Sequence, residues 1–156
     1  MKRRKIWVYI LFIAIPLAVG GLSALITNAG MPAFDRLQKP SFTPPSLLFP
    51  IVWSILYLLM GIGGGRVWRT GMTGRGKAIV LWAVKLLLNF FWTVWFFTAQ
   101  LYLLAFLWLV ALIAVIAAMI VSFSALDKLS AWLQVPYLLW CSFAAVLNFS
   151  IWLLNG

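Results

Sequence analysis

The sequence predicts an all-α integral membrane protein, a bundle of five transmembrane helices. Of its 156 residues, 65% are apolar and only 9% are charged, and the mean hydropathy is +1.08. A soluble domain is nearer half apolar and a quarter charged, so lipid is the expected solvent. Five apolar stretches are each long enough to cross about 30 Å of hydrocarbon as a helix. They cover residues 6–27, 47–69, 79–99, 103–124 and 130–154.

The first apolar stretch follows a basic N-terminus, residues 2–5, and in this respect it looks like a signal peptide. It is too long for the hydrophobic part of a signal peptide, and no clean small-x-small cleavage site follows it. We therefore expect an uncleaved first helix, in a chain whose residues 1–156 form a single domain.

The longest connection, residues 28–46, contains four prolines: Pro32, Pro40, Pro44 and Pro45. Proline disfavours helix and stiffens the backbone. We expect an ordered loop that caps one end of the bundle, with at most a short helical turn near residues 34–37.

Basic residues are concentrated at one end of the predicted helices. That end carries Lys2, Arg3, Arg4, Lys5, Arg66, Arg69, Arg75, Lys77 and Lys128. The other end has only Arg36 and Lys39. The positive-inside rule then predicts a bacterial cytoplasmic membrane protein with its N-terminus in the cytoplasm and its C-terminus outside. Because the basic residues do not form one polar face, the same distribution argues against nucleic-acid binding.

The composition excludes most catalytic chemistry. The sequence has no histidine and one cysteine, Cys141, and its only acidic residues are Asp35 and Asp127. We expect no metal site and no cofactor, and neither a Ser-His-Asp triad nor a carboxylate pair for hydrolysis.

Small residues recur at four-residue spacing in two of the predicted helices. Gly61 and Gly65 form one stripe, and Ala114, Ala118 and Ser122 form another. Such stripes allow close approach of helix backbones, either inside the bundle or at a dimer interface. The sequence has no internal repeat of the kind that builds many secondary transporters.

The ten tryptophans are the most unusual feature of the sequence. Four of them lie near predicted helix ends, as in an interfacial aromatic belt: Trp7, Trp68, Trp132 and Trp152. Trp53, Trp92 and Trp140 are too deep for a belt, since they lie about 9 to 20 Å along their helices from one end. These three tryptophans are expected at similar depths on three different helices.

Each deep tryptophan belongs to a stripe of aromatic, small and polar residues at helical spacing. The first stripe consists of Trp53, Tyr57 and Gly61, and the second of Asn89, Trp92 and Phe96. The third consists of Trp140, Ala144 and Asn148, with Leu147 next to Asn148. An unpaired amide is costly in hydrocarbon, so these faces are expected to point inward. Two interpretations fit equally well: a pocket for a flat, apolar ligand with some polar groups, or a packed core with interhelical hydrogen bonds.

Lys85 lies on the same stripe as Asn89, about 9 Å from the cytoplasmic end of its helix. We expect its stem to extend toward the headgroups. The alternative is a role toward a ligand carboxylate or a partner chain.

Four segments carry a family resemblance. They are LQKPSFTPP at 37–45, VWSILY at 52–57, LLNFFW at 87–92 and PYLLW at 136–140. With Phe143, Ala144, Leu147 and Asn148, they resemble the translocator protein family, also known as tryptophan-rich sensory proteins or peripheral-type benzodiazepine receptors. The motifs occur in family order between about residues 34 and 152. Many members of that family carry glutamine at the position of Lys85.

The resemblance implies a five-helix bundle, usually a homodimer, with a pocket beneath the first loop for porphyrins, sterols and synthetic ligands such as isoquinoline carboxamides. The implied ligand-binding residues are Ile26, Trp53, Tyr57, Asn89, Trp92, Trp140, Ala144 and Leu147. In bacterial relatives, tryptophans at the positions of Trp53 and Trp140 are associated with light- and oxygen-dependent breakdown of protoporphyrin.

Three functions follow from these observations. The first, which we favour, is a membrane receptor or sensor for porphyrins, and thus not an enzyme. The second is a porphyrin or lipid transporter, although the membrane interior lacks the carboxylates expected of a proton-coupled carrier. The third is slow photo-oxidative porphyrin degradation that uses Trp53 and Trp140.

Overall fold

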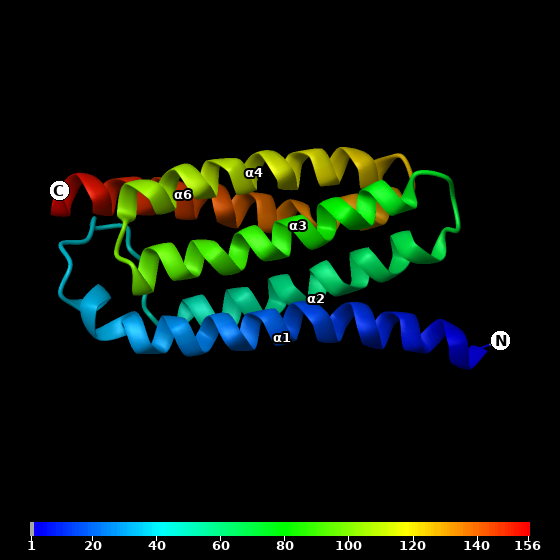
Figure 1. Cartoon of the computed structure of the whole chain (residues 1–156), viewed down its shortest axis with the longest axis horizontal. Helices are drawn as coiled ribbons and strands as arrows, with labels where there is room; N and C mark the ends of the chain where they lie inside the picture. The colour runs from blue at the N-terminus through cyan, green and yellow to red at the C-terminus, as the bar shows by residue number, and fades with distance from the viewer. Residues whose placement is uncertain (1) are drawn as a thin grey trace.

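The structure, a computed structural model, describes residues 2–156, with side chains from Ile6 onward. Long helices lie side by side, and the two termini are at opposite ends of the bundle (Figure 1). The helices are α1 (Lys2–Asp35), α2 (Leu48–Arg69), α3 (Arg75–Thr93) with its π-helical extension η1 (Val94–Thr98), α4 (Tyr102–Ser124), α5 (Lys128–Trp132) and α6 (Val135–Asn155). Five helical segments are long and apolar enough to cross a membrane, with α3–η1 and α5–α6 each counted as one segment. The predicted all-α, five-span fold class is thus confirmed.

Helix α1 extends beyond the end that the sequence predicts. It was expected to stop near residue 27, but it continues to Asp35, with Pro32 inside it. Tertiary contacts outweigh the loss of one backbone hydrogen bond at the proline. The Phe34 ring packs 6.0 Å from Phe96 and 5.9 Å from Phe97, measured between ring centroids. The prediction of a loop over residues 28–46 was therefore wrong for its first eight residues, and the connection begins at residue 36.

The fifth span is not one continuous helix, as the prediction of 130–154 assumed. It consists of α5 and α6, which are separated at residues 133–134. Pro136 stands in the first turn of α6. Proline is favoured there because its missing N–H has no helical partner in the first turn, whereas inside one continuous helix its ring would clash with the Trp132 carbonyl. The break also directs Gln134 into the bundle, where its side chain is fully buried.

Glycines bring α1 and α2 together in the half of the bundle near the N-terminus. A Cβ atom at Gly61 would lie 2.5 Å from the Ile13 Cα and 2.7 Å from the Phe12 carbonyl oxygen. At Gly65, a Cβ would lie 2.9 Å from the Tyr9 ring. The glycine stripe is therefore used for packing inside the bundle. On α4, by contrast, Ala114 and Ala118 are exposed.

The end of the bundle near the N-terminus is also fastened by an ion pair. The Arg66 guanidinium contacts the Asp127 carboxylate through Nε at 2.7 Å and Nη2 at 3.1 Å. Asp127 in turn accepts hydrogen bonds from the backbone N–H and the hydroxyl of Ser130, and it thereby caps α5. Close helix packing and this ion pair together hold this end of the bundle.

Candidate functional site

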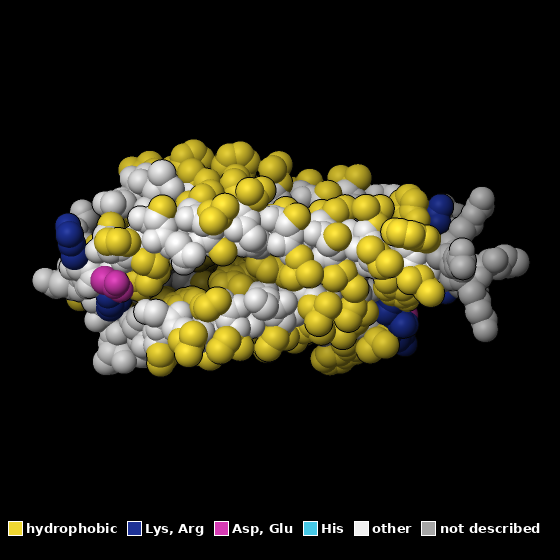
Figure 2. Space-filling view, turned by 90° about the horizontal axis from the view of Figure 1, so that it is seen from below, with side chains coloured by type: hydrophobic (Ala, Val, Ile, Leu, Met, Phe, Trp, Pro, Cys, Tyr) yellow, Lys and Arg dark blue, Asp and Glu magenta, His cyan; other side chains and the backbone are white. Residues whose placement is uncertain are grey.

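A cavity of about 400 Å³ lies in the half of the bundle that is covered by the loop after α1. Its walls come from α1, the loop, α2, α3–η1 and α6. In Figure 2, a hollow floored by apolar side chains is visible in this half of the molecule. The lining residues Ala24, Asn28 and Leu47 are exposed, so the cavity opens between α1 and the start of α2.

The structure brings together nearly all of the site residues that the sequence predicts. The cavity is lined by Trp53, Tyr57, Asn89, Trp92, Trp140, Ala144 and Leu147. Ile26 is the exception: it is half-buried but does not line the cavity. Its neighbour Thr27 does, because one residue along a helix rotates the side chain by about 100°.

The walls of the cavity are mainly aromatic. The Trp53 ring stacks on Tyr57 at a centroid distance of 5.6 Å and lies 6.3 Å from Trp92. Trp92 lies 5.7 Å from Phe96. Between α6 and α2, the Trp140 ring lies 5.9 Å from the Phe49 ring, measured between centroids. Such rings offer flat, apolar, polarisable surfaces that suit a planar ligand.

Hydrogen bonds hold these aromatic side chains in place. The Asn89 amide donates to the Tyr57 hydroxyl at 2.8 Å. The Trp92 indole N–H donates to the side-chain oxygen of Asn148, Oδ1, at 3.2 Å. The side-chain nitrogen of Asn148, Nδ2, donates to the Tyr102 backbone oxygen at 2.8 Å. The interhelical hydrogen bonds of a packed core and a ligand-sized cavity therefore occur together.

Two polar atoms of the lining have unused hydrogen-bonding capacity. Ser23 Oγ and Asn89 Oδ1 are buried, and the structure gives neither a hydrogen-bond partner. Buried polar atoms are normally paired, because an unpaired one costs free energy. Both atoms are available to a ligand that carries polar groups.

On α1 the sequence predicts only Ile26 as a site residue, and the α1 residues that do line the cavity were not predicted. These residues are Gly20, Ser23, Ala24, Thr27, Asn28, Met31 and Phe34. They form a stripe of mostly small and polar residues at helical spacing, and this stripe is the signal that would have found them. Gly20 is required because a Cβ there would lie 2.5 Å from the Tyr57 ring.

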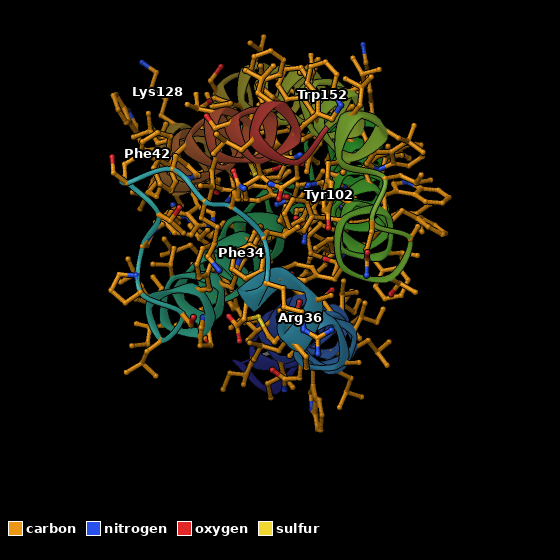
Figure 3. The ribbon with its side chains drawn as sticks, turned by 90° about the vertical axis from the view of Figure 1, so that its left-hand side faces the viewer. Phe34, Arg36, Phe42, Tyr102, Lys128 and Trp152 are labelled. Atoms are coloured by element: carbon orange, nitrogen blue, oxygen red, sulfur yellow. The ribbon has the colours of Figure 1, made fainter. Side chains whose placement is uncertain are left out.

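The loop is fastened over the cavity from two sides. In Figure 3, the loop arches across this end of the bundle. The Gln38 backbone N–H donates to Asn155 Oδ1 at 3.0 Å, and Asn155 Nδ2 donates back to the Gln38 oxygen at 2.9 Å. Lys39 Nζ donates to the carbonyl oxygens of Phe34 and Asp35 at the end of α1. The loop is thus a structured cover.

Lys85 does not extend to the headgroups, so that expectation was wrong. Its side chain is fully buried, and its Nζ donates to Gln134 Oε1 at 3.2 Å. The buried Gln134 supplies an acceptor that draws the amine into the bundle. The amine also lies 4.6 Å from the ring centroid of Tyr137.

The cavity walls offer aromatic surface, amides and hydroxyls, and no lining residue is acidic or basic. Among residues 2–156, no three His, Cys, Asp or Glu side chains come together as a metal site would require. The arrangement suits the binding of an apolar molecule better than acid–base chemistry.

Comparison with known proteins gives the same answer along almost the whole chain. The model of the TspO/MBR family matches residues 12–153. The chain is 39% identical to protein CrtK of Rhodobacter capsulatus over 88% of this chain and 87% of that one. It is 38% identical to the tryptophan-rich protein TspO of Chlorobaculum tepidum, with 97% and 98% covered. It is also 35% identical to the translocator protein of Sus scrofa, with 90% and 86% covered. The resemblance seen in the sequence motifs is confirmed: the chain is a multi-pass membrane protein and belongs to the TspO/MBR family.

Proposed function

We propose that the protein is a membrane receptor or sensor that binds porphyrins and other flat apolar ligands in the cavity beneath the loop. One observation carries this proposal: Trp53, Trp92 and Trp140, from three different helices, line one cavity of about 400 Å³. That volume lies within the usual range for small-molecule sites, roughly 300–1,000 Å³. Indole rings stack favourably on a flat conjugated ligand.

The relatives' names support a sensory or a transport role. One relative, from Cereibacter sphaeroides, is named tryptophan-rich sensory protein, and the Sus scrofa relative is named translocator protein. The sensor is the better fit here, because the cavity opens between α1 and α2 and the half near the N-terminus is closed by packing. Measuring porphyrin flux into sealed vesicles tests the transport alternative, which predicts uptake that increases with time.

The proposal includes a location and an assembly. The cavity end faces outward from a bacterial cytoplasmic membrane and the N-terminus faces the cytoplasm, as the distribution of basic residues indicates. The protein acts as a homodimer in contact with membrane lipids. Chemical cross-linking in native membranes tests the dimer, for which a band at twice the mass of 17.6 kDa is expected.

A fluorescence titration tests the binding site directly. Protoporphyrin added to the purified protein should quench tryptophan fluorescence saturably. Trp53→Leu should weaken binding at least about tenfold, because it removes a stacking surface. Trp132→Leu is the matched control, since Trp132 is 69% exposed and belongs to α5, outside the cavity lining. Quenching that does not saturate would refute the proposal, and so would equal effects of the two substitutions.

The placement of Trp53 and Trp140 on one cavity favours a second activity, slow porphyrin breakdown in light and air. In such a reaction the macrocycle is oxidised and dioxygen is reduced; the indoles of Trp53 and Trp140 stack on the ring and, because indole is itself oxidisable, take part in the electron transfer, which phenylalanine cannot do. The double substitution Trp53→Phe and Trp140→Phe should then abolish product formation but retain binding, because phenylalanine still stacks. Equal product yield from the wild type and the double variant under illumination would exclude this activity.

A further inference from the structure

A polar layer, which we call the polar floor, forms part of the cavity wall and continues into the bundle behind it. It consists of Ser23, Tyr57, Lys85, Asn89 and Tyr137, all of which are buried. Lys85 is its only side chain with a basic group. The Lys85 amine has neutral neighbours: the amide oxygen of Gln134 at 3.2 Å and the ring of Tyr137, whose centroid is 4.6 Å away.

The chain supplies no side-chain carboxylate to balance a charge on Lys85. The only two acidic residues of the sequence are Asp35 and Asp127. Asp127 is paired with Arg66 at 2.7 Å, and Asp35 is exposed at the C-terminal end of α1. An ammonium group within a membrane-spanning bundle is costly unless an anion accompanies it. Without one, a buried amine is expected to lose its proton, so an anion that keeps Lys85 charged must come from outside the chain.

The polar floor is continuous with the cavity. Asn89 lies one helical turn above Lys85 on α3, and both Asn89 and Ser23 line the cavity. The Tyr137 ring, which the Lys85 amine faces, lies 6.1 Å from the ring of the lining residue Trp53. One layer of side chains thus separates the amine from the space that a ligand would occupy.

The polar floor also has unused hydrogen-bonding groups. The Tyr137 hydroxyl and Ser23 Oγ are buried, and the structure gives neither a partner. Both hydroxyls are able to donate, and a carboxylate is a strong acceptor. A buried amine that lacks a counter-ion and a lining hydroxyl that lacks an acceptor, Ser23 Oγ, share one need, which is an anionic oxygen.

We propose that the ligand of this cavity carries an ionised carboxylate, and that Lys85 makes the protein select such an acid over its neutral ester. The inference rests on the proposed function, because it specifies the chemical class of ligand for the same cavity. The apolar body of the ligand lies between the aromatic walls, and its acidic group faces the polar floor. The Ser23 hydroxyl donates to the carboxylate, and the Lys85 ammonium attracts it through a medium of low dielectric constant.

The test compares two probes that share one macrocycle: protoporphyrin, which has two carboxylates, and its dimethyl ester, which has none. The dissociation constant of each is measured by tryptophan quenching in the same detergent for the wild type and for Lys85→Gln. The wild type should bind the acid about tenfold more tightly than the ester, a difference within reach of an attraction between opposite charges that acts across one layer of side chains in a medium of low dielectric constant. In Lys85→Gln this preference should fall to near unity, with affinity for the ester unchanged.

Two further variants make the result specific. Lys85→Met keeps an unbranched stem without a polar end and should lose the preference as Lys85→Gln does. Lys128→Gln removes one positive charge from an exposed position at the far end of the bundle and should keep the preference of the wild type. Glutamine keeps an unbranched stem and an amide N–H that is able to donate to the Gln134 oxygen as the lysine amine does, so Lys85→Gln is expected to fold.

The outcomes separate this inference from the proposed function. If both probes bind saturably with the same ratio in the wild type and in Lys85→Gln, the inference is wrong and the proposed function stands. Loss of the preference in Lys128→Gln as well would also overturn the inference, because a general effect of surface charge would then explain it. If neither probe binds the wild type, both proposals fail.

Discussion

At the scale of single residues, Asp127 has two roles at the end of the bundle near the N-terminus. It pairs with Arg66, and it caps α5 by accepting from the Ser130 N–H. The bond from Arg66 lowers the pKa of the Asp127 carboxyl from its usual 3.8 to about 2. Because the carboxyl has a lower pKa in the folded protein than in the unfolded chain, the ionised form stabilises the fold. That contribution is complete above about pH 4 and is lost as the pH falls through about 2.

We predict that Asp127→Asn lowers the free energy of unfolding at pH 7 by about 1 kcal/mol, a modest value because the ion pair is partly exposed to solvent. The difference between wild type and variant should disappear as the pH falls toward 2. Thermal unfolding in an acid-stable detergent at several pH values measures it. Asp35→Asn is the control, because Asp35 is exposed at the end of α1, and it should change stability little at any pH. A difference that persists unchanged at pH 2 would contradict the explanation.

At the scale of helices, the contact of α1 with α2 depends on the absence of a side chain at Gly61. A Cβ there would meet the α1 backbone at 2.5 to 2.7 Å, and a backbone cannot move aside as a flexible side chain can. We predict that Gly61→Ala lowers the free energy of unfolding by about 1–3 kcal/mol.

Gly21→Ala is the matched control for Gly61→Ala. A Cβ at Gly21 would have no atom within 4 Å, and Gly21 is also within a helix. Alanine there should leave stability unchanged or raise it by less than about 1 kcal/mol. Unfolding of both variants in mixed detergent provides the comparison. Similar losses for the two would show that close packing at Gly61 is not the cause.

The cover over the cavity gives a kinetic prediction. Asn155 makes two hydrogen bonds to the Gln38 backbone and so ties the loop to the end of α6. Asn155→Ala should free the loop and raise the rate of porphyrin dissociation several-fold, since lid opening often limits release. Stopped-flow displacement measures this rate. Ser150→Ala removes a hydroxyl that bonds only within α6, to the Val146 oxygen, and should leave the rate unchanged.

The helices were more predictable than their ends. The number of apolar stretches long enough to cross a membrane correctly predicted the number of spans. Helices α2 and α4 begin within one residue of the expected positions. The C-terminal part of α1 was missed because local propensity at Pro32 argues for a loop, while the contacts of Phe34 with Phe96 and Phe97 come from residues distant in the sequence. No local pattern shows such contacts in advance.

The site was predictable where residues of one helix share a face. Trp53 with Tyr57, and Asn89 with Trp92, line the cavity as their spacing indicates. Ile26, which only the family resemblance implies, lies one residue from the lining residue Thr27. Lys85 was misplaced because the direction of a long side chain depends on its partner, and Gln134 occupies a helix break that the apolar pattern did not reveal.

At the scale of the whole molecule, an odd number of spans places the two termini on opposite sides of the membrane. A labelling experiment tests which end of the bundle faces the cytoplasm. We predict that a membrane-impermeant maleimide modifies Ser41→Cys but not Lys128→Cys in intact cells. Both positions are exposed. Ser41 belongs to the loop between α1 and α2, and Lys128 is the first residue of α5; these two segments lie at opposite ends of the bundle (Figure 1). The experiment uses a Cys141→Ala background, although Cys141 is itself buried. Labelling of Lys128→Cys alone would reverse the proposed orientation.

The two halves of the bundle differ in how densely they are filled. In the half near the N-terminus, atoms of α1 occupy the positions that side chains at the α2 glycines would fill. The other half contains a cavity of about 400 Å³. Hydrostatic pressure favours whichever state has the smaller volume, and internal voids are the main volume that a protein is able to lose. Compression therefore acts on the cavity half first. A ligand that fills the space makes the molecule stiffer, so that occupancy changes its compressibility.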